Sequence, residues 1–432
     1  MPLRPITITP NFLSTAPSCL IACGGTRVLC TATIEEGAPA FVRAKGQGWL
    51  TAEYAMLPAS TGRRKARDGI KRDGRGVEIG RLIGRSLRQA VDMRKLGDRT
   101  IIIDCDVLEA DGGTRTASIT GGFVALVLAV DALIRAGKLF DSPIIRQVAA
   151  ISAGVVAGAP VLDLCYQEDS RADVDMNVVM DGEGHFIEVQ GTGEGDVFAR
   201  ETLNLLLNSA AEGIAALQKA QREALGEAAR WIAPKVPRLL LASNNAHKAA
   251  ELRELLAGRY EVLSLKEAGL VMDIEETGKT FAENAIIKAE AVLKATGVAA
   301  LADDSGLTVK ALRGAPGVHS ARYAGEGHDD AANNAKLLQN LAGKRKPWSA
   351  QFRCAMALAR PGRPTLVIQG AVPGEIIETA RGEDGFGYDP LFLYENGQTF
   401  AEMDAAAKNA VSHRARAVQA LLGALAAEDV CE

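Results

Sequence analysis

The chain has 432 residues, about three times the ~150 typical of one domain, so at least two domains are expected. Apolar residues make up 47%, charged residues 24%, and the net charge is −4, which excludes an intrinsically disordered chain. We expect no membrane span, because the longest apolar helical run, 123–130, ends at Asp131 and falls short of ~18 residues. An N-terminus without an apolar signal core and an odd number of cysteines, seven, favour a soluble cytoplasmic protein without disulfides.

The first half begins with strands. Segments 18–23 and 27–34 flank Gly24-Gly25-Thr26, which predicts a hairpin. Apolar spacing then predicts a helix over 77–96, with Arg81, Arg85 and Arg88 on one face. The further elements expected in this half are a buried strand over 100–106, an apolar helix over 117–136, a strand pair around 181–184 and a helical stretch over 199–231.

One segment of the first half is strongly basic. Residues 63–99 carry 13 Lys and Arg against 5 Asp and Glu, although the chain as a whole is slightly acidic. A local stripe of this kind attracts a polyanion.

The best domain boundary is Ala233-Pro-Lys-Val-Pro237, because two prolines end a helix and stiffen a short linker. A new strand, 239–242, follows at once, and strands then alternate with helices. We therefore predict an α+β domain over 1–232, a linker over 233–237 and an α/β domain over 238–432.

Two features of the first half suggest phosphate chemistry. Gly112-Gly113-Thr114-Arg115 lies between a strand and a helix, where free amides, a hydroxyl and a guanidinium form an anion cradle. Asp169, Asp173 and Asp175 form an acidic cluster suited to Mg²⁺. The alternatives are a tight loop with a surface arginine and a solvated acidic loop.

The first half resembles ribonuclease PH over roughly 3–232. The resemblance rests on long motifs in family order, at 46–54, 104–120, 168–169, 175–180 and 188–192. It implies a duplicated βαβα fold, a hexameric ring and phosphorolysis of RNA 3′ ends, notably of tRNA precursors, with inorganic phosphate as co-substrate and nucleoside diphosphates as products.

The resemblance also implies roles for individual residues. Arg75, Gly113, Thr114 and Arg115 would bind phosphate. Asp169 and Asp175 match the acidic pair linked to the divalent metal and to catalysis, and Arg64 and Arg67 lie where the family holds RNA. Phosphate itself is the nucleophile in this reaction, so arginine clamps and Mg²⁺ would bring two polyanions together.

The second half opens with a strand, a polar turn and a helix over 239–248. Ser243 or a neighbouring Asn would cap this helix, and Lys248 would lie in its first turn, where a bound phosphate offsets the unfavourable helix dipole. Two acidic turns, Glu275-Glu276 and Asp303-Asp304, suit a metal with few protein ligands. The alternative for Lys248 is an exposed side chain.

This half resembles the inosine triphosphate pyrophosphatase family over roughly 238–425. The motifs lie at 243–248, 275–278, 281–285, 302–307, 314–324, 385–390 and 412–414, in family order. The family hydrolyses non-standard purine nucleoside triphosphates (ITP, dITP, XTP) to monophosphate and diphosphate with Mg²⁺, and it forms dimers.

By this resemblance, Glu275 and Asp304 are the metal-linked acids, and Asp304 is the general base or orients the water. The residues implied to surround the nucleotide are Ser243, Asn244, Asn245, Ala246, His247, Lys248, Ser305, Phe386, Gly387, Tyr388, Asp389, Lys408, His413 and Arg414. Two other hypotheses stay open: a non-catalytic RNA-binding scaffold in the first half, and a general nucleotide phosphatase in the second.

Overall fold

The computed structural model describes residues 3–67, 73–194, 197–234, 236–243, 245–325, 327 and 329–429. The chain forms two compact units, Met1–Lys235 and Val236–Glu432. The division falls inside the proline-containing segment 233–237, and each unit has its own hydrophobic cores.

Two sheets build the first unit. The five-stranded sheet has the order β1-β2-β3-β5-β4, and the four-stranded sheet has the order β7-β6-β8-β9. The expected hairpin is confirmed, because β2 and β3 pair antiparallel around Gly24-Gly25. The strands are β1 Ile6–Pro10, β2 Ser18–Cys23, β3 Thr26–Glu36, β4 Trp49–Met56, β5 Arg99–Glu109, β6 Val148–Val156, β7 Ala159–Leu162, β8 Val174–Asp181 and β9 Phe186–Gly193.

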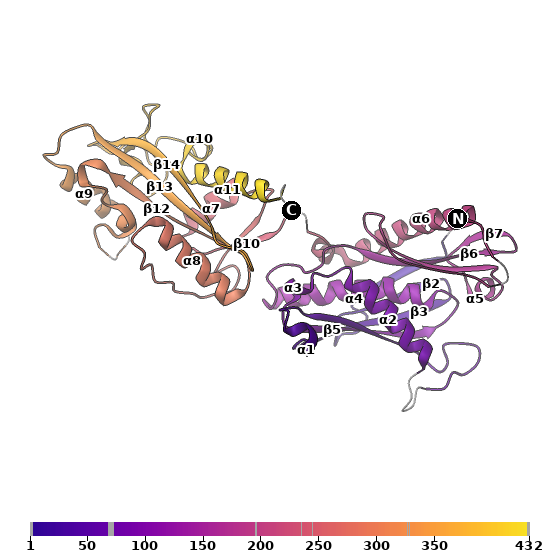
Figure 1. Ribbon diagram of the computed structural model, residues 1–432. Coiled ribbons are helices and arrows are strands. Elements are labelled where there is room, and N and C mark those ends of the chain that lie inside the picture. The colour runs from indigo at the N-terminus through magenta and orange to yellow at the C-terminus, as the bar shows by residue number, and fades with distance from the viewer. Residues whose placement is uncertain are drawn as a thin grey trace. The chain divides into compact units, whose positions relative to one another are not determined.

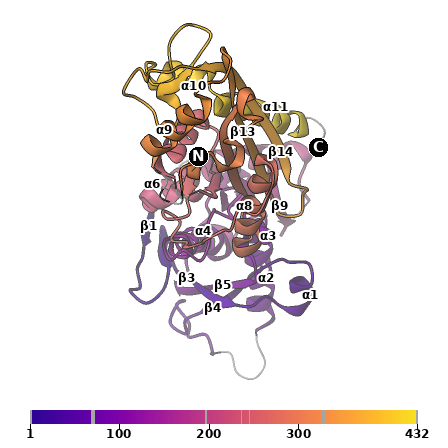
Figure 2. The same cartoon turned by 90° about the vertical axis from the view of Figure 1, so that its left-hand side faces the viewer.

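Helix α4, Thr114–Arg135, is the central helix of this unit and packs against strands of both sheets (Figure 1). Its length and apolar composition would suffice to cross a membrane, contrary to our expectation, but 78% of its most apolar window is buried inside the unit. Helix α2, Gly74–Arg88, covers the same face of the five-stranded sheet (Figure 2). The remaining helices are α1 Ala40–Arg43, α3 Met93–Leu96, α5 Tyr166–Asp169, α6 Arg200–Leu225 and the 3₁₀ helix η1 Gly226–Trp231.

The continuous helix expected over 77–96 is wrong at its C-terminal end. Helix α2 stops at Arg88, and the chain is extended at Val91, which bridges to Ile144. The side chain of Asp92 then caps the short helix α3 by accepting from the backbone N–H of Arg94. A backbone bridge to a residue far along the chain thus interrupts a helical pattern that is locally continuous.

One mixed sheet forms the centre of the second unit. Its order is β11-β10-β12-β13-β14-β15; the first three strands run parallel and the others antiparallel. The alternation of strands and helices therefore gives the expected α/β layout only up to β12. The strands are β10 Arg238–Leu241, β11 Glu261–Ser264, β12 Ala300–Val309, β13 Trp348–Ala359, β14 Leu366–Ile376 and β15 Phe392–Leu393.

Helices cover both faces of this sheet. Helix α8, Phe281–Thr296, packs on β12 and β13, and α11, His413–Asp429, covers β13 and β14 from the other side (Figure 1). Consecutive residues of β12 therefore point toward different helices. The other helices are α7 Ala246–Leu255, α9 Asp330–Leu341, α10 Ala405–Val411 and the 3₁₀ helices η2 Lys310–Leu312, η3 Gly317–Arg322 and η4 Asp389–Leu391.

Candidate active sites

The glycine turn before α4 is held rigidly. Gly112 has a φ of +75°, and a Cβ there would meet the carbonyl oxygen of Leu164 at 2.3 Å, so only glycine fits. Gly113, with a φ of +64°, precedes the helix and supplies no side-chain cap. The N–H groups of the first turn of α4 therefore have no capping side chain, a geometry that suits an anion.

Cationic side chains surround this helix start. The hydroxyls of Tyr54 and Thr114 lie 2.9 Å apart. Burial raises the pKa of Tyr54, whereas Thr114 and the charges of Arg75, Lys65 and Arg115 oppose the rise, which places all four near the ring. The structure thus brings together the predicted residues Arg75, Thr114 and Arg115 and adds Tyr54 and Lys65.

The acidic pair Asp169 and Asp175 lies within the electrostatic reach of Arg115. Burial and the neighbouring carboxylate of Asp169 raise the pKa of Asp175, whereas Arg115 lowers it and Glu194 raises it further. Asp175 lies near the start of β8 and Asp169 at the end of α5, and both are half-buried. Two carboxylates that repel each other beside an arginine suit a divalent cation or a phosphate network better than a purely structural role.

The predicted RNA contacts Arg64 and Arg67 are both exposed, in the segment between β4 and α2. In the sequence they precede Arg75, the predicted phosphate-binding residue at the start of α2. Sequence reasoning did not assign Tyr54 or Lys65, although Tyr54 belongs to the 46–54 motif, because a motif does not show which side chain meets the helix start.

In the second unit, the first predicted nucleotide-binding residues lie at the N-terminus of α7. The side chain of Asn245 caps the helix by accepting from the N–H of Lys248 at 3.1 Å, and the hydroxyl of Ser243 accepts from the N–H of Asn245. Ala246 and His247 are exposed in the first turn. Asn244 lies outside the described residues.

Lys248 reaches a carboxylate that the sequence prediction did not assign. Its Nζ lies 3.3 Å from Oδ1 of Asp303, which is fully buried on β12. Asp303 therefore provides the anion that stabilises a cation in the first turn of α7. The predicted alternative of an exposed lysine is wrong, since the Lys248 side chain is only 16% exposed.

A buried ion network continues from Asp303. Arg414, itself 1% exposed, contacts Asp303 at 3.0 Å and also pairs with Glu251 of α7. Arg414 donates to the hydroxyl of Ser305 at 3.1 Å. Burial opposes ionisation of Asp303, but Lys248, Arg414 and Lys288 hold its pKa well below the ordinary value. Asp303 is thus a fixed negative charge that orients two cations.

Asp304 points to the α8 face and has a different environment. Its Oδ2 accepts from the Nδ2 of Asn284 at 3.0 Å, and its Oδ1 lies 3.7 Å from the Nζ of Lys288. Burial raises the pKa of Asp304, Lys288 and Lys248 oppose the rise, and the negative charge of Glu276 adds to it. A buried carboxylate with a raised pKa next to a lysine has the character of a general base.

The structure brings Glu276 into this cluster rather than the predicted Glu275. The Nζ of Lys288 donates to Oε1 of Glu276 at 3.0 Å, whereas Glu275 is exposed. The residues alternate along an extended segment, so the choice depends on which of them faces α8. The sequence motif alone does not show which of the two glutamates faces α8.

This difference gives a direct prediction. Glu276→Gln should lower pyrophosphate release from ITP by about 10²-fold, because a positioned acid contributes on that order, and Glu275→Gln should stay within about twofold of the parent chain. Initial rates at saturating ITP and Mg²⁺ check this. A larger loss of rate in Glu275→Gln than in Glu276→Gln would show that Glu275, not Glu276, is the functional acid.

The glycine-rich loop 385–389 presents one aromatic ring. The backbone N–H of Phe386 donates to Asp389 at 2.9 Å, and Lys408 donates to the same oxygen at 2.7 Å. Lys408 Nζ lies 4.7 Å from the Phe386 ring centroid. The polar groups of Gly387 and Tyr388 are used internally, with Asp330, Asn334 and Ser320. We conclude that Phe386 and Lys408 face the site and that Gly387 and Tyr388 fix the loop.

His413 is buried beneath this region. Its ring stacks on Phe352 with centroids 5.0 Å apart, and its Nδ1 has no hydrogen-bond partner among the described residues. Burial and the neighbouring charge of Arg414 lower the pKa of His413 well below 6.5. His413 is therefore neutral in the folded protein and has one nitrogen that can accept or donate to a ligand.

The state of His413 predicts a pH dependence of stability. Because the pKa of His413 is lowered in the folded protein, the unfolded chain binds more protons than the folded chain below pH 6.5. As the pH decreases below 6.5, the free energy of unfolding of the second unit should therefore decrease by up to about 1.4 kcal/mol per pH unit. Thermal unfolding between pH 7.5 and 5.5 measures this slope. His413→Gln should be less stable but have a shallower slope; an unchanged slope would contradict the assignment.

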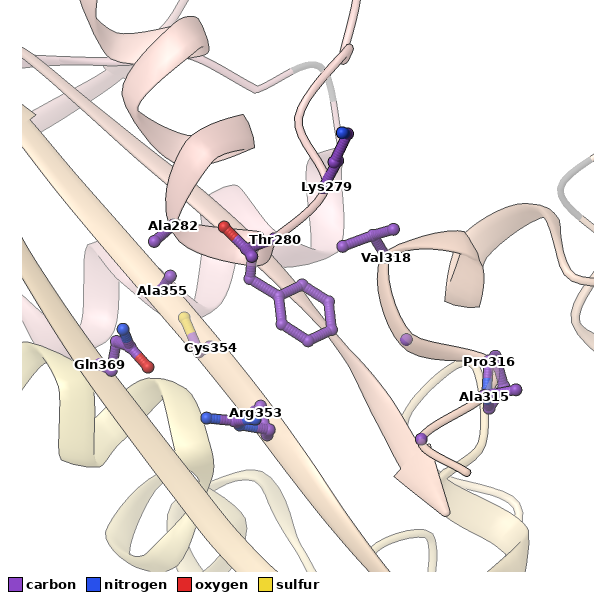
Figure 3. Close-up of a pocket in the computed structure, with 13 residues that line it drawn as sticks. Lys279, Thr280, Ala282, Ala315, Pro316, Val318, Arg353, Cys354, Ala355 and Gln369 are labelled. Atoms are coloured by element: carbon purple, nitrogen blue, oxygen red, sulfur yellow. The ribbon is translucent and has the colours of Figure 1, made fainter. Parts of the chain in front are cut away.

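A pocket of about 480 Å³ opens between the N-terminus of α8, the loop 314–318 and β13 (Figure 3). Ala355, which lines it, is the cross-strand partner of Asp304. Arg353 and Gln369 bring polar groups to its wall, and Lys279 stands at the helix start. None of the residues predicted to hold the nucleotide lines this pocket.

Among the described residues, no group of three or more His, Cys, Asp or Glu forms a preassembled metal centre. The acids come in pairs, Asp169 with Asp175 and Asp304 with Glu276. Paired carboxylates fit Mg²⁺, which takes few protein ligands and completes its shell with phosphate oxygens and water.

Comparison with known proteins decides the family. Residues 2–130 and 146–213 match domains 1 and 2 of the 3′ exoribonuclease family. Ribonuclease PH of Neisseria gonorrhoeae is 57% identical over 229 residues, which cover 52% of this chain and 95% of that protein. The Neisseria meningitidis protein is 56% identical over the same length. The chain belongs to the ribonuclease PH family.

Beyond this ribonuclease PH unit, residues 239–424 match the Ham1 family. A HAM1 protein of Coxiella burnetii is 45% identical and covers 44% of this chain and 99% of its own, with a TM-score of 0.42. The dITP/XTP pyrophosphatase of Mycobacterium abscessus is 44% identical and covers 43% and 98%, with a TM-score of 0.37. The second unit belongs to the Ham1 family, so both predicted resemblances are confirmed.

Membership of the two families makes the chain an enzyme with two catalytic units. Both families are associated with phosphate and with divalent metal ions. The site residues described above come from both units.

Proposed function

We propose that this chain is a bifunctional enzyme. Its ribonuclease PH unit trims RNA 3′ ends, notably of tRNA precursors, by phosphorolysis to nucleoside diphosphates. Its Ham1 unit hydrolyses non-standard purine nucleoside triphosphates, such as ITP, dITP and XTP, to monophosphate and diphosphate. The observation that carries the proposal is that each unit gathers paired acids and cations near a helix start, an arrangement suited to a polyphosphate.

In the ribonuclease PH unit, inorganic phosphate would sit at the start of α4. The amides after Gly113, the hydroxyl of Thr114 and the guanidinium of Arg115 surround that position, and Arg75 adds a second cation. Arginine clamps align phosphate with the RNA 3′ phosphodiester and reduce their repulsion. Asp169 and Asp175 would hold Mg²⁺, which neutralises charge that develops on the phosphoryl oxygens.

RNA would reach this position along the exposed basic segment. Arg64 and Arg67 are exposed in the segment between β4 and α2, and arginine contacts of this kind go to the phosphate backbone without reading the bases. We therefore expect RNA affinity to fall steeply with salt.

In the Ham1 unit, Asp304 would orient or deprotonate the water that attacks the α-phosphate. Lys288 stabilises the negative charge of Asp304, and Lys248 stands ready for the phosphates once a ligand competes for it with Asp303. Glu276 and Asp304 would hold Mg²⁺, which polarises the α-phosphate. The diphosphate leaves, and the monophosphate receives the water oxygen.

Selection of inosine and xanthine over adenine would depend on donors that face the 6-oxo group. The candidates are Nδ1 of His413, the one buried and unpartnered ring nitrogen among the described residues, and the ammonium of Lys408. Donors that pair with an oxo group are left unpaired or clash opposite an amino group, and unpaired buried polar groups discriminate by orders of magnitude.

The assembly is also a proposal: a hexameric ring through the ribonuclease PH unit and dimers through the Ham1 unit. Both contacts must fit one closed symmetry. A solution mass measurement tests it, with a multiple of six chains expected.

The activity test uses the full chain and two substrates. With Mg²⁺ and phosphate, an RNA with a free 3′ end should release nucleoside diphosphates, and omission of phosphate should stop the release. ITP, dITP and XTP should yield monophosphate and diphosphate much faster than ATP or GTP. RNA binding without release would indicate a scaffold, and similar rates on ATP and ITP would indicate a general phosphatase.

A further inference from the structure

His247 is among the residues implied to surround the nucleotide, but the proposed chemistry gives its side chain no role. It is exposed, in the first turn of α7, one residue before Lys248. Its ring stacks on Phe386, with centroids 5.6 Å apart and an interplanar angle of 22°. The contact therefore joins the phosphate-binding turn to the aromatic loop, two segments more than 100 residues apart in sequence.

The same Phe386 ring already has a cation near it. Lys408 Nζ is 4.7 Å from its centroid, fixed there by Asp389. Phe386 itself is held by the hydrogen bond from its N–H to Asp389. Of the two stacked rings, Phe386 is thus restrained and half-buried, whereas the imidazole of His247 stands on an exposed side chain that can rotate.

A purine between the two rings would require a wider gap. Two stacking contacts of about 3.5 Å each need ring planes roughly 7 Å apart, and the present rings, with centroids 5.6 Å apart, are too close to admit a base. Rotation of the exposed imidazole about its own side-chain bonds opens the gap without moving the backbone of α7 or the loop 385–389.

We propose that His247 forms the second, movable wall of the purine slot: the base inserts between the imidazole and Phe386 and is stacked on both faces. This inference rests on the proposed function and gives His247 a specific role in it. The two rings close on each other when the slot is empty, which covers part of the apolar face of Phe386.

Two alternatives make different predictions. If His247 only packs on the loop, its removal changes stability and leaves substrate binding alone. If it contacts the phosphates instead of the base, its removal weakens binding of any polyphosphate. Stacking acts on the base alone, and every purine has a π-face, so the preference for ITP over ATP should not depend on it.

The experiment compares the full chain with His247→Ala and His247→Phe. His247→Ala should raise KM for ITP by roughly three- to tenfold, the range of one lost aromatic contact, with kcat unchanged within about twofold. His247→Phe, which keeps an aromatic ring, should restore KM. His185→Ala, an exposed histidine of the ribonuclease PH unit, is the matched control and should leave KM for ITP unchanged.

A base-free probe separates the base from the phosphates. Inorganic tripolyphosphate should inhibit ITP hydrolysis with the same inhibition constant in the parent chain and in His247→Ala. A weaker inhibition by tripolyphosphate in His247→Ala would overturn the stacking role, as would an unchanged or lower KM for ITP. A parent chain that does not hydrolyse ITP would refute the proposed function itself, so the two failures are distinct.

Discussion

Replacing Asp304 with Asn should lower kcat for ITP hydrolysis by about 10²- to 10⁴-fold, the range for a positioned acid–base group. The carboxylate is buried between Asn284 and Lys288, so an amide of equal size keeps the packing and removes the proton acceptor. The RNA activity should be unchanged, because each unit has its own core and its own set of acids.

The pH profile gives this prediction a second readout. The ionised form of Asp304 is the active one, and burial raises its pKa. The rate should therefore fall with decreasing pH at a higher pH than an ordinary aspartate would give, and Asp304→Asn should lose this acidic limb. Asp273→Asn, an exposed acid of the same unit, is the control. Hydrolysis by Asp304→Asn within tenfold of the parent chain would rule out the role.

Asp303→Asn should behave differently, although it is the neighbouring residue. It removes the buried carboxylate that Arg414 and Lys248 share and leaves Arg414 with Glu251 alone; removing one partner of a buried ion pair costs on the order of 3–5 kcal/mol. The expected result is a loss of folding stability of the Ham1 unit. A loss of stability in Asp303→Asn and a loss of kcat in Asp304→Asn would distinguish the structural role of Asp303 from the catalytic role of Asp304.

The largest effect expected in the ribonuclease PH unit concerns phosphate. Arg115→Ala should raise the phosphate concentration for half-maximal RNA release by about 10- to 100-fold, because a charge-assisted hydrogen bond contributes about 1.5–3 kcal/mol. Arg115 lies in the first turn of α4 and lowers the pKa of Asp175, so its loss also leaves the acids less compensated. ITP hydrolysis should not change.

A matched control exists in the same helix. Arg135 is exposed in the last turn of α4, where it pairs with Asp131, at the opposite end from Arg115. Arg135→Ala should leave the phosphate dependence as it is in the parent chain. Equal phosphate curves for Arg115→Ala and Arg135→Ala would refute the phosphate role of Arg115.

The sequence predicted the elements whose signals are local. The apolar run of α4, the hairpin at Gly24-Gly25 and the start of α7 at Asn245 depend on neighbouring residues, and the structure confirms them. The end of α2 was missed because the strand-like contact of Val91 with Ile144 spans a long stretch of chain. The spacing of apolar residues along a segment does not show which distant residue will pair with it.

The candidate sites show the same division. Motifs identified Lys248, Asp304 and Arg414, but not that Lys248 and Arg414 share Asp303, since the three residues come from α7, β12 and α11. Alternation along β12 places Asp303 and Asp304 on opposite faces, and only the packing of α8 decides which acid meets Lys288. The same packing favours Glu276 over Glu275.

The central claim is that phosphate breaks the bond in one unit and water breaks it in the other. The most direct test is to carry out both reactions in ¹⁸O-labelled water and to analyse the products by mass spectrometry. We predict that IMP from ITP acquires one ¹⁸O while the diphosphate acquires none, and that nucleoside diphosphates from RNA contain no label from water. Label in the diphosphate, or labelled monophosphates from RNA, would contradict the account.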